Sequence, residues 1–466
     1  MKEFGWGSIA RLGLVQACIG AIVVLTTSTL NRVMVVELAL PALLPGCLVA
    51  LHYLVQVARP RMGHGSDVGG RRTPWIVGGM AVLAAGGIIS ALATVWMASN
   101  RPAGILLAVF GFGLIGLGVS ASGTSLLVML AKRVPASRRG PAATLVWMMM
   151  IAGFAITAGV AGQWLDPYSP QRLLSVTATV SALAFALTLL ALHGLEGYGR
   201  EATAAMTTHA DKAAPQEVKP GFRQALAEVW AEPAARRFTI FVFVSMLAYS
   251  AQDLILEPFA GSVFGYTPGS STKLSGVQHG GVLLGMILVA LAGLVGARFA
   301  HHRLWRHAGS LRGWTLGGCV ASAAAMLALS AAGVVGPGWP LKTTVFLLGV
   351  ANGAFSIGAI GSMMRMANEG RHSREGVRMG LWGAAQAVAF GLGGLVGTAA
   401  SDLARWLVAS PGLAYSSVFA LEALMFLVSA ALAWKISAPA TPARPATRPP
   451  RPSAAPGLEL SRAGET

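Results

Sequence analysis

Long apolar runs constrain the fold of this 466-residue chain more than any other feature. About twelve of them are long enough to cross the roughly 30 Å hydrocarbon core of a bilayer as helices rising about 1.5 Å per residue. They cover residues 9–36, 41–58, 74–98, 103–131, 141–164, 171–194, 237–260, 276–299, 313–335, 341–366, 377–400 and 412–435. Charged residues make up only 11% of the chain, about half the usual share of a water-soluble protein. The sequence therefore predicts an all-α polytopic membrane protein.

Two polar segments organise these runs. Residues 195–235 are rich in charged side chains and are predicted to form a linker with a surface amphipathic helix near Phe222–Trp230. Residues 437–466 are rich in Pro, Ala and Arg and are predicted to be disordered. We therefore expect an N-terminal six-helix half at 1–194, the linker at 195–235, a C-terminal six-helix half at 236–436 and a tail at 437–466.

The distribution of basic residues predicts the orientation. Nearly all of the 35 lysines and arginines fall in loops on one side of the predicted helices. The exceptions are Arg101, Arg172, Lys273, Lys342 and Arg405 on the other side, and Arg32 within a helix. Because loops rich in Lys and Arg stay in the cytoplasm, both termini and the linker are predicted to be cytoplasmic. The net charge of +17 is thus a topology signal, and no nucleic-acid partner is expected.

A short loop after the second apolar run carries Gly63, Asp67, Gly70, Arg71 and Arg72. This spacing resembles the G-x-x-x-D-x-x-G-R-R signature of the major facilitator superfamily, and the resemblance implies a 6+6 transporter architecture. In such a loop Asp67 can cap a helix or pair with an arginine and so hold one conformation. The alternative is a polar turn that only obeys the positive-inside rule.

Charged and amide side chains inside the predicted helices form a second set of candidates. Asn31, Arg32 and Glu37 lie in the outer part of the first helix, and Gln252, Asp253 and Glu257 lie in the seventh. A charge inside the membrane is costly, so these groups should pair. We expect Arg32 to meet Asp253 or Glu257 in a gate, because Glu37 is five positions away and poorly aligned on an α-helix. The alternative is a static ion network.

Four longer strings resemble a more specific family. Thr29–Leu38, Gln252–Phe259, Gly358–Met364 and Gly380–Ala387 are similar to the bacteriochlorophyll delivery family, which includes PucC and LhaA. The first helix resembles most the group labelled bacteriochlorophyll synthase 44.5 kDa chain. The resemblance implies a photosynthetic intracytoplasmic (bacterial inner) membrane protein that binds bacteriochlorophyll or a precursor and delivers it to light-harvesting polypeptides. Bacteriochlorophyll biosynthetic enzymes are further candidate partners.

No enzymatic activity is expected, although the label names a synthase. Prenyl transfer needs clustered carboxylates that hold a magnesium diphosphate, and no two aspartates lie close together in the sequence. No catalytic residues, metal site or covalent cofactor are predicted. Bound bacteriochlorophyll would need a ligand for its magnesium, and the candidates are His52, His193, His279 and Gln386, each of which can instead be an ordinary interhelical hydrogen-bonding group. A proton-coupled small-solute permease and a non-transporting scaffold for antenna assembly remain alternative functions.

Overall fold

The computed structural model describes residues 4–56, 72–135, 138–195, 222–298, 310–368 and 375–436. Within these ranges the regular secondary structure is helical, and eleven helices are long and apolar enough to cross a membrane. A shorter apolar helix, α2 (Leu43–Val55), follows the first of them in the chain. The prediction of an all-α protein with about twelve membrane helices is confirmed.

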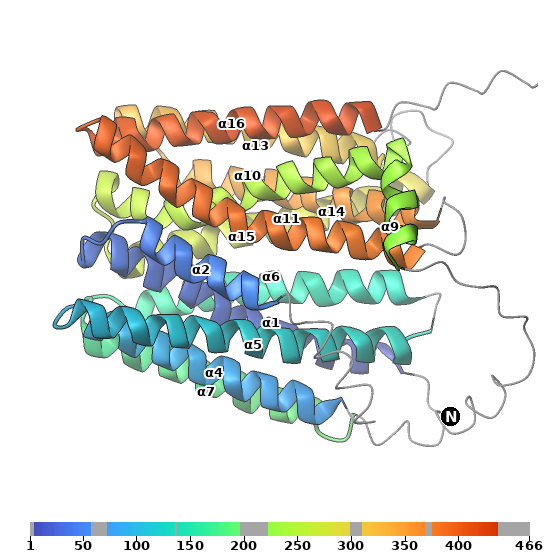
Figure 1. Ribbon diagram of the computed structural model, residues 1–466, viewed down its shortest axis with the longest axis horizontal. Coiled ribbons are helices and arrows are strands. Elements are labelled where there is room, and N and C mark those ends of the chain that lie inside the picture. Colours follow the sequence, from blue (N-terminus) through green and yellow to red (C-terminus); the bar gives the residue numbers. More distant parts are fainter. Residues whose placement is uncertain are drawn as a thin grey trace, which may run out of the picture.

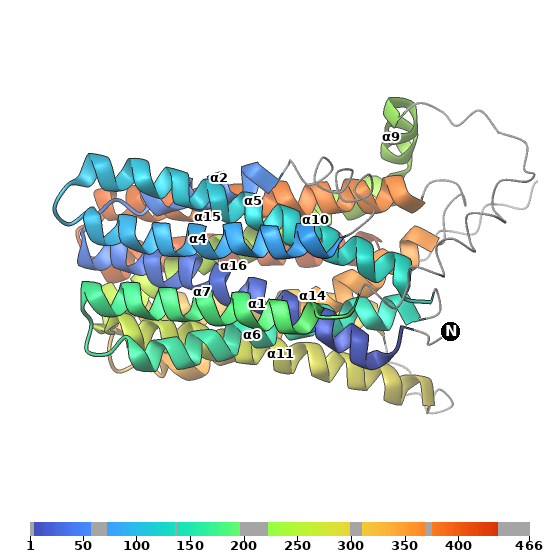
Figure 2. The ribbon, with the colours of Figure 1, turned by 90° about the horizontal axis from the view of Figure 1, so that it is seen from below.

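The helices run back and forth along the long axis of one elongated bundle, which is horizontal in Figures 1 and 2. The first is continuous over Trp6–Glu37 and consists of α1 (Trp6–Val24) extended by two π-helical segments, η1 (Leu25–Leu30) and η2 (Val33–Glu37). It is followed by α2, α4 (Thr73–Trp96), α5 (Arg101–Arg133), α6 (Arg139–Trp164) and α7 (Pro170–Leu192). The second set is α10 (Pro233–Phe264), α11 (Pro268–Arg298), α13 (Leu311–Val335), α14 (Leu341–Asn368), α15 (Glu375–Leu407) and α16 (Pro411–Ile436).

The two ends of the bundle are chemically different. We call the end that carries the start of α1 and the end of α16 the terminal face, on the right in Figure 1. We call the opposite end, where the first helix stops at Glu37 and α2 starts at Leu43, the distal face. The helix ends at the terminal face carry basic residues such as Arg133 and Arg139.

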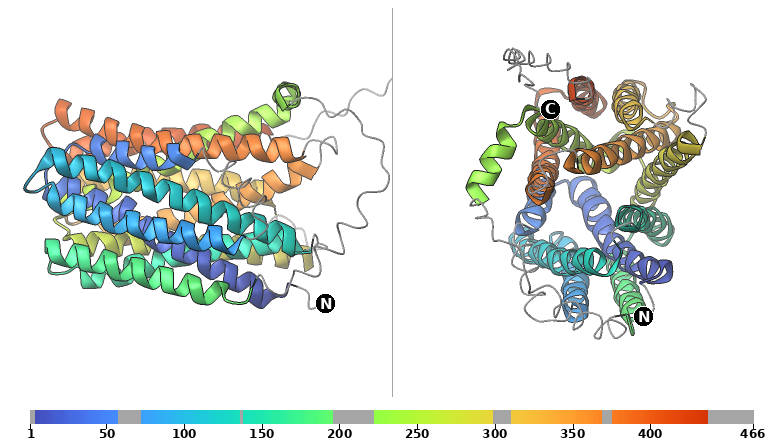
Figure 3. Two further views of the ribbon diagram at one scale, coloured as in Figure 1. Left: turned by 60° about the horizontal axis from the view of Figure 1, so that its bottom comes forward. Right: turned by 90° about the vertical axis from the view of Figure 1, so that its right-hand side faces the viewer.

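Each set of helices has its own apolar core. Seen end-on in Figure 3, the helices of the first set (blue to green) occupy one side of the bundle, and those of the second set (yellow-green to red) occupy the other. The second core is rich in aromatic rings, for example Phe259 with its centroid 4.9 Å from Phe419 and 5.5 Å from Tyr415. The two sets meet where α6 packs on α11 and where α2 packs on α15.

Helix α11 begins eight residues earlier than predicted, at Pro268 instead of residue 276. The extra residues are polar, and the hydropathy pattern therefore assigns them to a loop. In the structure Ser271, Thr272 and Ser275 are buried. Thr29 and Ser28 of η1 supply hydroxyl partners for Thr272 at 3.0 Å and for Ser275 at 3.1 Å. Because these hydroxyls satisfy one another, a polar helix start is stable inside the bundle.

The polar segments are described only in part. The short helix predicted in the linker is present as α9 (Phe222–Ala231), directly before α10. Residues 196–221, the tail 437–466 and the loop residues Gly63, Asp67, Gly70 and Arg71 lie outside the described residues. Arg72, the last residue of the loop signature, is described and precedes the first residue of α4 as its N-cap.

Candidate functional site

The π-helical end of the first helix determines how Arg32 is paired. In an α-helix residues five apart point in different directions, but a π-helical turn closes between residues i and i+5. Arg32 stands immediately before η2 and Glu37 is its last residue, and the Arg32 guanidinium donates a hydrogen bond to the Glu37 carboxylate in an ion pair. Among the described residues the ion pair of Arg32 is therefore with Glu37, and not with Asp253 or Glu257 as α-helical spacing suggests, although the Arg32 charge still acts on the Glu257 carboxyl group.

The Arg32 side chain also ties the first helix to the second set. Its other terminal nitrogen donates to the backbone carbonyl of Tyr266, between α10 and α11, at 2.6 Å. Gly261 of α10 makes room for the guanidinium, because a Cβ there would lie 2.9 Å from a guanidinium nitrogen. The Arg32 side chain is 3% exposed and that of Glu37 is 34% exposed, so the ion pair runs from the interior toward the distal face.

Tyr168, in the loop between α6 and α7, lies near the Arg32–Glu37 ion pair. Burial raises the pKa of the Tyr168 phenol above its ordinary value, the Glu37 carboxylate raises it further, and the Arg32 guanidinium partly opposes the shift. A raised pKa keeps the phenol protonated at neutral pH. Tyr168 therefore remains neutral beside the Arg32–Glu37 pair.

Further hydrogen bonds join the two sets in the distal half of the bundle. The Asn31 amide, which is 1% exposed, donates to the backbone carbonyl of Leu254 in α10 at 2.6 Å. The hydroxyl pairs Ser28–Ser275 and Thr29–Thr272 lie on the same helix surface. Asn31 and Arg32 thus both bind the second set, as the gate hypothesis requires, but they do so through backbone carbonyl groups.

Two aspartates, which the sequence reasoning did not include as site residues, hold helix starts across the same interface. Asp402 of α15 accepts hydrogen bonds from the backbone N–H groups of Ala42 at 2.9 Å and Leu43 at 2.7 Å, at the start of α2. Asp166, just after α6, accepts from the backbone N–H of Gly269 at the start of α11 at 3.2 Å and lies 3.6 Å from the Lys273 ammonium. A carboxylate at a helix N-terminus is favourable because the free N–H groups carry partial positive charge.

These two contacts are related by the repeat between the two sets. Helices α6 and α15 are each the fifth membrane helix of their set, and α2 and α11 are each the second. Each fifth helix therefore caps the second helix of the other set at the distal face. Two local signals point to these helix starts: Pro268 at the first turn of α11 and the acidic residue near the end of each fifth helix.

Three carboxylates lie inside the second set and have no ion-pair partner among the described residues. Glu257 and Glu422 are 1% and 2% exposed, and none of their oxygens makes a hydrogen bond. Asp253 is partly accessible, and the Gln278 amide donates to it at 3.4 Å. The carboxyl groups of Asp253 and Glu422 are close enough to repel each other when charged. Gln252 is fully buried, and neither atom of its amide makes a hydrogen bond.

The four candidate magnesium ligands differ in what their atoms already bind. The Nε2 atom of His52 lies 2.9 Å from the Gln56 amide nitrogen, which can only donate, so its lone pair is engaged. His193 is exposed at the C-terminal end of α7. The Gln386 amide nitrogen lies 3.9 Å from the Met246 sulfur. His279 is buried, its Nδ1 lies 2.8 Å from the Ser275 carbonyl oxygen, and its ring stands edge-on to Phe154 at 5.0 Å.

Of these groups, His279 has the arrangement of a metal-ligating histidine. Its Nδ1–H donates to a backbone carbonyl, which fixes the tautomer and leaves the Nε2 lone pair directed away from that bond. The ring lies at the contact between α6 and α11, one helix from each set. Nε2 is therefore the ring nitrogen of His279 that the Ser275 carbonyl does not engage.

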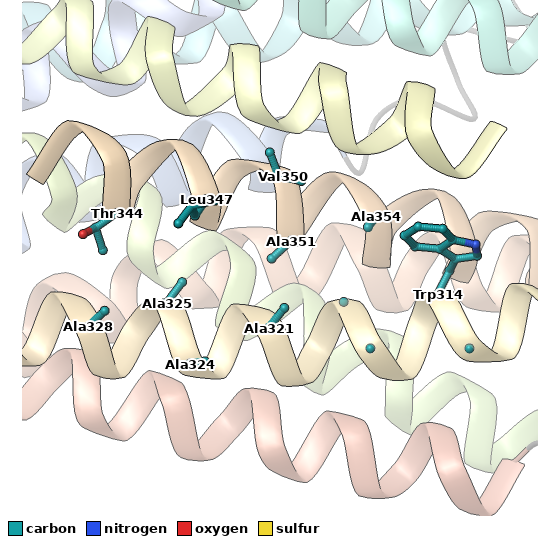
Figure 4. A pocket seen from close by; sticks show the side chains of 13 residues that line it. Trp314, Ala321, Ala324, Ala325, Ala328, Thr344, Leu347, Val350, Ala351 and Ala354 are labelled. Atoms are coloured by element: carbon teal, nitrogen blue, oxygen red, sulfur yellow. The ribbon is translucent and has the colours of Figure 1, made fainter. Parts of the chain in front are cut away.

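A groove with a volume of about 720 Å³ lies elsewhere, between α13 and α14 (Figure 4). Small side chains of α13, among them Ala321, Ala324 and Ala328, form one wall, and Leu347 and Val350 of α14 form the other. Trp314 stands at one end. None of the predicted site residues lines the groove.

Comparison with known proteins agrees with this architecture. A protein-family model described as PUCC protein matches residues 29–441. The bacteriochlorophyll synthase 44.5 kDa chain of Rhodobacter capsulatus is 52% identical over 446 residues, which are 96% of this chain and 98% of the relative. The protein PucC of Rhodobacter capsulatus is 28% identical, and the match covers 93% of this chain and 92% of PucC.

Solved structures show the fold. A crystal structure of a D-xylose-proton symporter matches with a TM-score of 0.64 at 15% identity, covering 90% of this chain and 97% of the symporter. A bacterial homologue of the human lysosomal transporter Spinster matches with a TM-score of 0.61 at 15% identity, covering 92% and 96%. The fold of the chain is therefore of the major facilitator type. Because the family model matches most of the chain and a relative is 52% identical over nearly its whole length, the chain belongs to the PucC family of membrane proteins.

Proposed function

We propose that this protein is a non-enzymatic membrane carrier that binds bacteriochlorophyll or a precursor and delivers it to light-harvesting polypeptides. The observation that carries the proposal is the 52% identity, over 96% of the chain, to a relative named as a bacteriochlorophyll synthase chain. The major facilitator-type fold supports a carrier, because such folds bind their ligands between two six-helix halves. We interpret the word synthase in the relative's name as an association with pigment synthesis.

We further propose that Nε2 of His279 ligates the magnesium of the pigment. Its Nδ1 is already held by the Ser275 carbonyl, and the ring lies between α6 and α11, where the halves meet. Phe154 offers an aromatic edge beside it. Bacteriochlorophyll would be cargo here, and the chain's contribution is to bind and orient it out of contact with water.

The absorption spectrum of protein purified in mild detergent from a pigment-making host tests both statements. We expect bacteriochlorophyll or a precursor to copurify with the wild type. His279→Ala should retain roughly tenfold less pigment, which corresponds to a loss of about 1.4 kcal/mol of binding free energy. His193→Ala is the matched control and should retain pigment like the wild type. Wild-type protein without pigment would contradict the carrier, whereas equal retention by His279→Ala would contradict only the ligand assignment.

Two other functions predict different results. A proton-coupled permease is favoured by the partly accessible carboxylate of Asp253 and the buried one of Glu257. It predicts solute uptake into vesicles that a proton gradient drives, without copurifying pigment. A scaffold for antenna assembly predicts neither pigment nor uptake, but a loss of light-harvesting complexes when the protein is removed.

The orientation of the protein is part of this proposal, because delivery requires contact with cytoplasmic biosynthesis. We expect single cysteines at Arg101 and Lys342, which are exposed at the distal face, to react with an impermeant maleimide in intact cells. Cysteines at Arg138 and Arg236, exposed at the terminal face, should react only after permeabilisation. The background replaces Cys18, Cys47 and Cys319. Reversed labelling would place the termini outside the cytoplasm.

A further inference from the structure

A polar pocket lies at the distal face between the end of α6 and the start of α7, and the carrier function leaves it unexplained. Its volume is about 470 Å³. Gln163 and Trp164 line it from α6, and Arg172, Ser175 and Thr179 line it from α7. The two helices lie side by side (Figure 2), and all five side chains are exposed. We call this feature the α6–α7 pocket; it opens to the surroundings of the bundle.

The charge that the α6–α7 pocket offers a ligand is positive. The Nη1 atom of Arg172 donates to the Asp166 backbone carbonyl at 2.6 Å, which holds the guanidinium at the pocket. The Asp166 carboxylate also borders the pocket, but both of its oxygens are engaged by α11. Oδ1 accepts from the Gly269 N–H at 3.2 Å, and Oδ2 lies 3.6 Å from the Lys273 ammonium. The Asp166 charge is therefore compensated by the second set, and the Arg172 charge is left to attract an anion.

The other polar groups of the pocket suit the same kind of ligand. The amide of Gln163, the hydroxyl of Thr179 and the indole N–H of Trp164 are all able to donate hydrogen bonds. Phosphate oxygens accept such bonds, and a guanidinium binds phosphate through charge-assisted ones. Tryptophan is also typical of the depth at which lipid headgroups lie. The pocket thus has the chemistry and the position of a phosphate headgroup site.

An exposed apolar surface continues from the pocket toward the middle of the bundle. Val160 and Ile156 of α6 lie four and eight residues from Trp164, and Leu183 and Leu187 of α7 lie at the same intervals from the other wall of the pocket. Residues four apart share one face of a helix, and these four apolar side chains are exposed. Eight residues span about 12 Å, and half of the roughly 30 Å hydrocarbon core is about 15 Å. The apolar surface therefore matches the length of acyl chains in one leaflet.

We propose that the α6–α7 pocket binds the headgroup of an anionic phospholipid from the leaflet at the distal face. The phosphate binds to Arg172 and the neighbouring donors, and the acyl chains lie along Ile156 and Val160 on one side and Leu183 and Leu187 on the other. A free phosphate ion would use the pocket alone, whereas a lipid uses the pocket and the apolar surface together. The inference goes beyond the carrier function and does not depend on it.

The test adds four probes separately to full-length protein in mild detergent. They are dioleoylphosphatidylglycerol, which is anionic, dioleoylphosphatidylcholine, which is zwitterionic, dioleoylglycerol, which lacks the phosphate, and inorganic phosphate. The midpoint of thermal unfolding is measured against the concentration of each probe, because a ligand that binds the folded state raises it. Native mass spectrometry counts the bound lipid molecules. We expect phosphatidylglycerol to act at a concentration roughly fivefold or more below that of the other three probes.

Variants assign the lipid to this pocket. Arg172→Gln should weaken the binding of phosphatidylglycerol roughly fivefold, the effect of one basic side chain on an anionic headgroup. Arg405→Gln is the matched control, because Arg405 is also exposed at the distal face, beside the exposed Trp406, and does not line the pocket. It should bind lipid like the wild type.

A second variant keeps the test valid if Arg172→Gln does not fold. Gln163→Ala combined with Thr179→Ala removes one donor from each wall and retains Arg172 with its bond to the Asp166 carbonyl. This double variant should weaken the binding of phosphatidylglycerol by roughly threefold or more. Unchanged binding in either variant would contradict the assignment to the α6–α7 pocket.

The probes separate the other occupants. Equal effects of phosphatidylglycerol and phosphatidylcholine would exclude selection of an anionic headgroup. An equal effect of dioleoylglycerol would leave apolar contacts only, and an equal effect of inorganic phosphate would make the pocket a site for a free anion; either result overturns the proposal. An equal loss in Arg405→Gln and Arg172→Gln would show that binding follows the surface charge and not this pocket. No pigment is present in these measurements, so failure here and failure of the carrier proposal are distinguishable.

Discussion

Gly281→Ala is expected to lower the stability of the protein by roughly 2–3 kcal/mol, while Gly280→Ala, one residue earlier, should change it by less than about 1 kcal/mol. Both glycines lie in α11. A Cβ on Gly281 would collide with the backbone carbonyl oxygen of Phe346 in α14, whereas a Cβ on Gly280 would meet nothing within 4 Å. The same added methyl group therefore forces two helices apart at one position and has free space at the other.

The contact between α11 and α14 depends on such glycines from both sides. Gly281 and Gly285 of α11 each approach the backbone of α14, and Gly349 and Gly353 of α14 each approach the backbone of α11. Each pair has the small-xxx-small spacing that lets membrane helices pack backbone against backbone. The clash at Gly281 involves backbone atoms, so no side-chain rotation can relieve it.

Thermal unfolding in detergent, followed by size-exclusion chromatography, measures this difference. We expect Gly281→Ala to have a clearly lower midpoint and a lower yield of monodisperse protein, and Gly280→Ala to resemble the wild type. Equal stability of the two variants would show that α11 and α14 can separate by the width of a methyl group without loss.

Arg32→Met is expected to reduce stability by roughly 2–3 kcal/mol, because it removes a buried cation together with its bonds to Glu37 and to the Tyr266 carbonyl. Glu37→Gln should cost less, since the Glu37 side chain is 34% exposed and water can replace part of the interaction. Arg32→Lys should restore part of the loss, because an ammonium group keeps the charge but reaches only one of the two acceptors.

A double-mutant cycle identifies the partner of Arg32. We expect a coupling energy of about 1–2 kcal/mol between Arg32→Met and Glu37→Gln, and less than about 0.5 kcal/mol between Arg32→Met and Asp253→Asn. The readout is again the free energy of unfolding in detergent. Stronger coupling to Asp253 than to Glu37 would restore the pairing that α-helical spacing suggests and would contradict the π-helical phase of η2.

The number and order of the membrane helices could be predicted from the sequence because hydropathy adds up residue by residue. Any run of about 20 apolar residues favours the bilayer whatever its neighbours are. The position of α9 could also be predicted, because an amphipathic pattern is local. The resemblance of strings such as Thr29–Leu38 indicated the family, and the match over residues 29–441 confirms it.

The start of α11 and the hydrogen bonding of His279 could not be predicted in this way. Polar residues such as Thr272 and Ser275 look like part of a loop in the sequence until the hydroxyls of Thr29 and Ser28 are known to face them. His52, His193 and His279 are equivalent candidates in the sequence, and their hydrogen bonds alone separate them. The glycine spacing of α11 and α14 can be read in the sequence, but it does not indicate which helices pack against each other.

The ion pair of Arg32 shows most clearly what cannot be predicted from the sequence. By itself the sequence determined that a charge lies in the first helix, that it must be compensated, and that Glu37, Asp253 and Glu257 are candidates to compensate it. Only the tertiary structure decided among them, because the π-helical turn rotates Glu37 into line with Arg32 and the packing of α10 places the Tyr266 carbonyl opposite. Burial is a property that single residues bring to a fold, whereas pairing depends on helix phase and on neighbours distant in the chain, which no local pattern encodes.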